Sequence, residues 1–217
     1  RPMASGNMPI LNGLILAAIL LTGGLILASQ LSFLFFVIVL FYFITSFSYS
    51  MYLKRIVLYD VFILALLYST RVFAGGIVTE VPLSFWLIAF STFIFLSLAF
   101  VKRYSELAQV SGDKGLKSRG REYFTEDISL LQTMGVASGF MSVIVFSLYI
   151  DSPEVAKLYS QPKILWAISL LFLFWISRIW LITIRGKMTD DPIIFALKDK
   201  TSYFIFLFVG IIIMLSI

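Results

Sequence analysis

The stretch LSFWLIAFSTFIFLSLAFV, residues 83–101, carries no charged side chain and is long enough to cross a lipid bilayer as one helix. A strand of a membrane barrel would instead alternate apolar and polar residues over about ten positions. The polar segment KRYSEL, residues 102–107, follows directly. Together the two stretches predict a membrane helix that ends at a charged surface.

The rest of the chain repeats this pattern of long apolar runs separated by polar residues and prolines. We expect seven membrane helices, at roughly 9–29, 31–49, 58–78, 83–101, 127–150, 163–184 and 202–217. The composition agrees, because 60% of the 217 residues are hydrophobic and 13% are charged, which a soluble domain of this size cannot bury. The sequence predicts an all-α polytopic transmembrane bundle, with residues 1–217 forming a single integral membrane domain.

Positive charge is concentrated at one end of these expected helices. Most of the 17 Lys and Arg residues belong to one set, formed by Arg1 and the cations of segments 50–57, 102–126 and 185–201. Lys157 and Lys163 lie in a connection at the other end. The positive-inside rule then makes the three segments cytosolic loops of a protein in the inner (cytoplasmic) membrane. No interleaving of basic and aromatic residues outside the spans points to RNA or DNA, so we expect no nucleic-acid partner.

The chain contains no cysteine and no histidine. Disulfides, thiolate metal sites and a histidine base are therefore excluded, and catalysis would depend on carboxylates, Tyr, Lys, Arg or a bound cation. The segment 102–126 groups six cations, which suit phosphate: Lys102, Arg103, Lys114, Lys117, Arg119 and Arg121. The alternative is that these cations set topology and contact the headgroups of membrane lipids.

Several blocks of sequence resemble a known family. RPMASGNMPI, residues 1–10, is similar to the R-P-[LI]-x-S-G-x-[LIV] segment of the UbiA superfamily of intramembrane prenyltransferases. Five further blocks follow in the family's order: YSMYLKR (49–55), RVFAGG (71–76), PLSFW (82–86), KRYSEL (102–107) and DDPIIFALKD (190–199). These blocks most resemble the decaprenylphosphoryl-5-phosphoribose synthase branch.

The resemblance implies a bundle of nine helices, of which this chain shows seven. In the family an N-D-x-x-D-x-x-x-D motif and two helices precede the RPxxSG segment. We therefore expect this chain to be truncated at its amino end and to bind its donor poorly alone. The motif that is absent from this chain would hold Mg2+, the cofactor that the family implies.

The branch implies transfer of a 5-phosphoribosyl group from phosphoribosyl diphosphate to a polyprenyl phosphate. Its partners would be a polyprenyl lipid and a phosphorylated small-molecule donor, and the sequence does not indicate an oligomeric state. The resemblance and the charges together suggest two catalytic candidates and six for substrate binding: Glu106 and Lys54, then Lys102, Arg103, Tyr104, Arg119, Tyr123 and Arg71.

Two departures keep other functions open. No D-x-x-x-D occurs in 102–126, although ordinary UbiA prenyltransferases carry a second acidic motif there, and Tyr49 precedes Lys54 by one residue too many for Y-x-x-x-K. One alternative is a UbiA-type prenyltransferase that attaches a polyprenyl chain to an aromatic or other small acceptor. A weaker alternative is a non-enzymatic membrane transporter, although the spans show few polar residues and no repeat.

Charged residues within or beside the spans raise further expectations. Arg71 lies near the middle of its span, where an unpaired charge is costly; Asp60 is three turns away, so other helices or a lipid phosphate would supply a partner. Arg178 lies nearer a helix end and can snorkel. The pair Asp191-Pro192 predicts the start of a helix. The pairs Gly23-Gly24 and Gly75-Gly76 permit close approach of helices.

Overall fold

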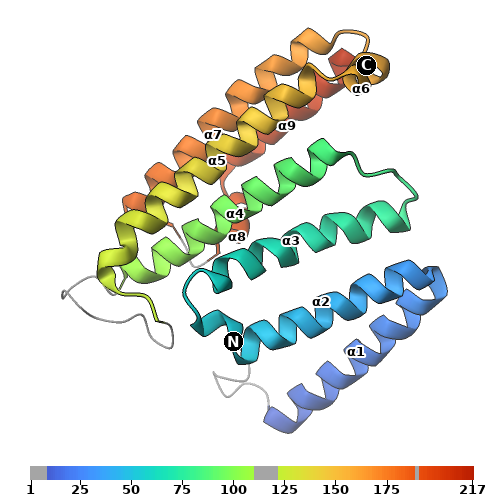
Figure 1. Ribbon diagram of the computed structural model, residues 1–217, viewed down its shortest axis with the longest axis vertical. Coiled ribbons are helices and arrows are strands. Elements are labelled where there is room, and N and C mark those ends of the chain that lie inside the picture. Colours follow the sequence, from blue (N-terminus) through green and yellow to red (C-terminus); the bar gives the residue numbers. More distant parts are fainter. Residues whose placement is uncertain (1–8, 110–121, 189–190) are drawn as a thin grey trace.

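A computed structural model describes residues 9–109, 122–188 and 191–217, and the structural statements below concern those residues. Their regular structure is helical (Figure 1). The longer helices are α1 (Ile10–Leu31), α2 (Phe33–Met51), α3 (Tyr59–Val78), α4 (Phe85–Ala108), α5 (Ile128–Ile150), α7 (Trp166–Ile184) and α9 (Lys200–Ser216). Short elements connect them: α6 (Pro153–Leu158), α8 (Pro192–Ala196) and the 3-10 turns η1 (Leu53–Arg55), η2 (Thr125–Asp127) and η3 (Pro162–Leu165).

These helices confirm the predicted all-α polytopic bundle. Six helices are long and apolar enough to cross a membrane, and α9 is a shorter apolar helix of 17 residues. One boundary differs from the sequence expectation. Helix α4 continues to Ala108, so KRYSEL forms its last turns rather than the start of a polar connection. Lys, Arg, Glu and Leu are good helix formers, and the charges find partners on neighbouring elements, as described below.

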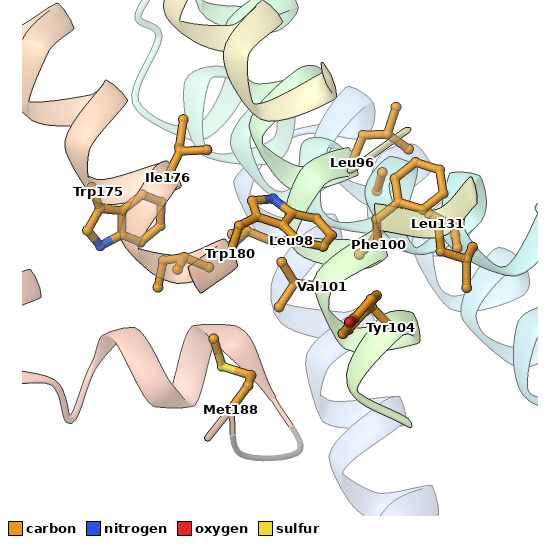
Figure 2. Close-up of a cluster of buried hydrophobic side chains, with 14 of the residues drawn as sticks. Leu96, Leu98, Phe100, Val101, Tyr104, Leu131, Trp175, Ile176, Trp180 and Met188 are labelled. Carbon is orange, nitrogen blue, oxygen red and sulfur yellow. The ribbon is translucent and has the colours of Figure 1, made fainter. Parts of the chain in front are cut away.

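Helices α4, α5 and α7 form the tightly packed part of the bundle. A Cβ atom added at Gly135 of α5 would lie 2.2 Å from the Trp180 ring of α7 and 2.7 Å from Cβ of Phe100 of α4. One turn later, a Cβ at Gly139 would lie 2.6 Å from Ile176. Figure 2 shows Trp180 and Ile176 in the buried cluster with Phe100. Two glycines spaced by three residues thus allow α5 to approach both neighbours.

The glycine pairs singled out in the sequence have a smaller part in packing. Among the described residues, no neighbouring helix comes within 4 Å of a Cβ built at Gly23, Gly24 or Gly75, so the expected close approach is not found at these three positions. Gly76 alone faces a neighbour, the side chain of Leu83. A Gly-Gly pair therefore indicated helix contact less well than the Gly-x-x-x-Gly spacing of α5.

Helix α2 lies beside α3, and α1 lies beside α2 on the side away from the packed helices (Figure 1). Ala28 is the buried residue of α1, and α2 has none. Their outward side chains are mostly Leu, Ile and Phe, which suit a surface in contact with lipid. The end of α2, the start of α3, the end of α4 and the start of α5 meet at one end of the molecule, called here the charged end.

Candidate active site

The centre of the charged end is an ion pair between α3 and α4. Asp60 lies in the first turn of α3 and Arg103 in the last turns of α4. Arg103 Nε lies 2.5 Å from Asp60 Oδ2, as a charge contact without hydrogen-bond geometry, and both side chains are 0% exposed. A charge buried this completely is tolerated only beside a counter-ion. The pair therefore fixes the start of α3 against the end of α4.

Tyr123 joins this pair from the segment that leads into α5. Its hydroxyl donates to Asp60 Oδ1 (2.7 Å) and accepts from the backbone N–H of Leu58 (2.8 Å). Leu58 has φ +67°, a backbone conformation that costs energy for a residue with a side chain. Burial raises the pKa of Tyr123 well above its ordinary value, and the hydrogen bond from Leu58 opposes this only in part. Tyr123 is therefore a neutral donor that holds the start of α3.

Glu106 brings a second carboxylate to Arg103. The Nη1 group of Arg103 donates to Glu106 Oε2, and the guanidinium lies over the ring of Tyr123 with 5.8 Å from Cζ to the ring centroid. The Glu106 side chain is 30% exposed. Arg103 is thus enclosed by two acids and one aromatic ring, and Glu106 is the member of the group that reaches solvent.

Lys102 points to a different partner. Its Nζ lies 3.2 Å from Oδ2 of Asp191, and the two side chains are 25% and 23% exposed. The other carboxylate oxygen of Asp191 accepts from the backbone N–H of Ile193 (2.9 Å) and so caps α8. This confirms the predicted helix start at Asp191-Pro192. Lys102 is partly accessible, and a phosphate ligand would compete with Asp191 for it.

The structure brings several of the predicted site residues to one end. The carbonyl of Arg55 accepts from the N–H of Glu122 (3.2 Å), so η1, which carries Lys54, lies beside the segment that carries Tyr123. Lys54, Arg103, Glu106 and Tyr123 therefore belong to connected elements. Arg119, which is predicted to contact phosphate, lies outside the described residues, as do the other three cations of that segment, Lys114, Lys117 and Arg121.

Tyr104 faces the hydrophobic core. It is 7% exposed, and its ring lies edge-on to Trp180 with 6.0 Å between centroids (Figure 2). The side chain packs α4 against α7. Ligand binding by Tyr104 stays a prediction, for which the observed packing provides no support.

Arg71 lies apart from the charged end. Its Nη2 donates to the hydroxyl of Tyr42 on α2 (2.5 Å), and its guanidinium lies 5.3 Å from the ring centroids of both Tyr42 and Tyr68. Asp60 does not reach it, because eleven residues of helix separate the two by about 16 Å. The Arg71 guanidinium is thus contacted by two neutral side chains, Tyr42 on α2 and Tyr68 on α3.

Arg178 is paired rather than snorkelling. Its two terminal nitrogens donate to the two carboxylate oxygens of Asp199, at 2.6 and 2.9 Å. Burial raises the pKa of Asp199, but hydrogen bonds from Arg178 and Ser202 outweigh this effect and hold the pKa below its ordinary value. Asp199 also caps α9 through the N–H of Ser202. The group is a structural clamp between α7 and α9.

The described residues hold no ready-made metal site of three or more acidic ligands. Within 9–109, 122–188 and 191–217, no three His, Cys, Asp or Glu side chains come close enough together to hold a metal ion. The best buried carboxylate, Asp60, is already satisfied by Arg103 and Tyr123.

Sequence reasoning missed Asp60 and Tyr42. The sequence places Asp60 three turns from Arg71 and indicates no role for it at the site, and it indicates none for Tyr42. The signal for Asp60 was a carboxylate in the first turn of a membrane helix, which calls for a buried cation nearby. Tyr42 gave no signal of its own, because aromatic residues are common throughout these spans.

Comparison with known proteins shows which family and which relatives this chain resembles. The chain matches the UbiA prenyltransferase family over residues 1–198. It is 34% identical to the uncharacterized protein y4nM of Sinorhizobium fredii over 94% of this chain and 40% of that protein. It is 30% identical to the nodulation protein NoeC of Azorhizobium caulinodans, over 93% of this chain and 66% of that protein.

A third relative is named for its reaction. The decaprenyl-phosphate phosphoribosyltransferase of Mycolicibacterium smegmatis is 28% identical over 95% of this chain and 66% of its own length. The chain therefore spans 40% to 66% of the length of these three relatives. With its six long apolar helices and a family match that covers most of its length, the chain is a multi-pass membrane protein that belongs to the UbiA prenyltransferase family.

Proposed function

We propose that this protein transfers a 5-phosphoribosyl group from phosphoribosyl diphosphate to a polyprenyl phosphate, at the cytosolic face of the inner membrane. The observation that carries the proposal is the similarity, along 95% of the chain, to a decaprenyl-phosphate phosphoribosyltransferase. Membership of the UbiA family supports the broader class, a transferase that acts on isoprenoid lipids within the membrane.

The reaction suits the residue types at the charged end. The bond between the anomeric carbon and the diphosphate breaks, and an oxygen of the lipid phosphate forms the new bond to that carbon. Positive charge develops on the sugar while negative charge leaves with the diphosphate. The protein then needs to position two phosphate-bearing partners and to neutralise the leaving group, which cations do without a histidine or cysteine nucleophile.

Lys102 is the best-placed cation for the donor. It is partly exposed and is held by one carboxylate, so exchange of Asp191 for a diphosphate oxygen would cost little. Lys54 would contribute from the rim and Glu106 would orient the donor ribose. Arg103 and Tyr123 are buried in the Asp60 network, so their contribution would be to fix the last turns of α4. Contact of Arg119 with phosphate stays a prediction.

The second candidate is transfer of a polyprenyl chain onto a small acceptor, which the family match as a whole favours. An apolar cavity of about 250 Å³ lies between α4, α5, α7 and α9, with walls that include Trp86, Phe90, Phe146 and Phe172. Such walls suit an isoprenoid chain in either reaction. In this alternative the diphosphate would leave from the prenyl chain, and the charged end would again neutralise it. Mg2+ would accompany the diphosphate in both.

The deciding experiment measures transfer of label from phosphoribosyl diphosphate to polyprenyl phosphate in detergent with Mg2+. The full product of the gene is compared with its Lys102→Ala variant. Lys157→Ala is the matched control, because Lys157 is an exposed lysine on α6, at the opposite end. We expect lipid-linked ribose phosphate from the parent and the control, and at least tenfold less from Lys102→Ala at subsaturating donor. Transfer from a prenyl diphosphate onto an aromatic acid instead would overturn the proposal.

A further inference from the structure

The charge of Arg71 is not neutralised by the residues that contact it. A guanidinium has five N–H donors, and in the described part of the chain one of them meets the Tyr42 hydroxyl, while two ring faces cover the cation. Hydroxyl and rings are neutral. They lower the cost of placing the charge in a membrane span without supplying the counter-ion that such a charge calls for. The remaining donors are available to an anion.

The space beside Arg71 can hold such an anion. An open cavity of about 570 Å³ lies between α2 and α3, and its walls include Arg71, Tyr42 and Thr70. The other walls are apolar, among them Phe35 and Val39. Polar groups thus occupy one part of the cavity and apolar groups the rest. This division matches a lipid with a small anionic head and a hydrocarbon chain.

The depth of the site favours a lipid over a soluble phosphate. Arg71 follows the first residue of α3 by about 18 Å and precedes the last by about 10 Å, and Tyr42 lies about 14 Å from either end of α2. The guanidinium is therefore in the middle of the span. A soluble phosphate would have to lose its hydration to reach this level, whereas a membrane lipid can enter from the side.

The direction of the side chains links Arg71 with Lys102. Side chains lean toward the amino end of their helix, and α3 begins at the charged end whereas α4 ends there. Arg71 therefore leans toward the charged end, as its contact with Tyr68 one turn earlier shows. Lys102 Nζ reaches Asp191 at the start of α8. The Tyr68 ring lies 5.4 Å from that of Phe95 on α4, so Tyr68 lies between Arg71 and α4, and Phe95 precedes Lys102 by about 10 Å along that helix.

We propose that Arg71, with the hydroxyl of Tyr42, binds the phosphate of the acceptor, an isoprenoid lipid monophosphate whose first isoprene units lie along the apolar walls between α2 and α3. This inference rests on the proposed function, because it assigns one of its two substrates to a place. The acceptor phosphate is then presented from the membrane interior toward a donor held near Lys102.

Binding in the absence of donor tests the site. The probe is farnesyl phosphate, with farnesol as the uncharged counterpart, added to the full gene product in detergent and measured by equilibrium binding. We expect Arg71→Gln to weaken the binding of farnesyl phosphate at least tenfold and to leave the binding of farnesol unchanged. Arg71→Lys should be intermediate, because charge is retained and the fork is lost. Tyr42→Phe should weaken binding two- to fivefold and tests the site even if Arg71→Gln unfolds.

Arg178→Gln is the matched control, since it removes another arginine of a membrane helix, one whose charge Asp199 already neutralises. It should leave farnesyl phosphate binding unchanged. Equal binding of farnesyl phosphate to Arg71→Gln and the parent protein would overturn the site. Equal competition by phosphatidylglycerol would overturn the assignment to the acceptor and indicate a site for bulk lipid phosphate.

Binding and turnover separate this inference from the proposed function. Loss of farnesyl phosphate binding in Arg71→Gln, in a protein that transfers no phosphoribosyl group, would support the anion site and overturn the function. Phosphoribosyl transfer that proceeds normally in Arg71→Gln would support the function and overturn the site.

Discussion

The guanidinium of Arg103 and the carboxylate of Asp60 form an ion pair in which neither side chain is exposed. The pair connects the last turns of α4 with the first turn of α3. Tyr123 adds the segment before α5 to the same contact. Lys102 and Glu106, the neighbours of Arg103 that reach solvent, therefore depend on a buried group for their position.

Asp60→Asn should destabilise the protein strongly. The amide keeps the shape of the carboxylate but leaves Arg103 with Glu106 as its remaining acid, and breaking a buried pair costs about 3–5 kcal/mol. Thermal unfolding in detergent measures the loss. Asp151→Asn, at an exposed acid beyond the end of α5, should leave the midpoint unchanged. Equal midpoints for Asp60→Asn and the parent would show that the pair contributes no net stability.

Tyr123→Phe should lower the free energy of unfolding by about 1–3 kcal/mol. Loss of the hydroxyl leaves the N–H of Leu58 and the Oδ1 atom of Asp60 without this partner. The cost should also depend on pH. Burial raises the pKa of Tyr123 in the folded state, so the unfolded chain releases this proton first as pH rises above about 10. The stabilisation by Tyr123 is fully present below that pH and declines above it.

The measurement for Tyr123 is the difference in unfolding free energy between Tyr123→Phe and the parent, from pH 8 to 11. The difference should be constant up to about pH 10 and then shrink. The difference cancels the titration of the other tyrosines and lysines. A difference in unfolding free energy that stays constant up to pH 11 would contradict a raised pKa of the Tyr123 hydroxyl.

The long helices could be predicted from sequence because each depends on a local property, an apolar run of sufficient length. The end of α4 was not predictable in this way. Lys102 and Arg103 look like the start of a polar loop until their partners, Asp191 and Asp60, are placed beside them. Those partners lie far away in sequence, and their proximity depends on which faces of the helices meet.

The gathering of charged residues at one end was predictable, but the surroundings of each residue were not. The cations of KRYSEL lie at the charged end, and phosphate binding there stays a prediction. Burial then distinguishes Lys102, which is partly exposed, from Arg103, which is enclosed. Helix rotation decides this difference between two adjacent residues, and the apolar pattern of α4 near its end is too uniform to reveal the rotation.

Gly135→Ala should be destabilising although alanine is the better helix former. The added methyl would lie 2.2 Å from the Trp180 ring, and crowding of this kind costs about 1–3 kcal/mol. Gly210→Ala on α9 is the control, since no other element of the described structure comes within 4 Å of its Cβ position. There the change should be neutral or stabilise by up to about 1 kcal/mol. A higher midpoint for Gly135→Ala would show that α5 and α7 are less tightly packed.

Asp191 both caps α8 and pairs with Lys102, and Asp191→Asn separates these two roles. Asparagine caps a helix as well as aspartate does, so α8 should keep its start while Lys102 loses its counter-ion. If Lys102 binds the donor diphosphate, Asp191→Asn should lower KM for phosphoribosyl diphosphate or leave it unchanged, and Lys102→Ala should raise it at least tenfold. Steady-state transfer assays at saturating polyprenyl phosphate give both values. A rise in KM of similar size in Asp191→Asn would mean that the donor site needs the carboxylate itself, and Lys102 would then act by holding Asp191 in place.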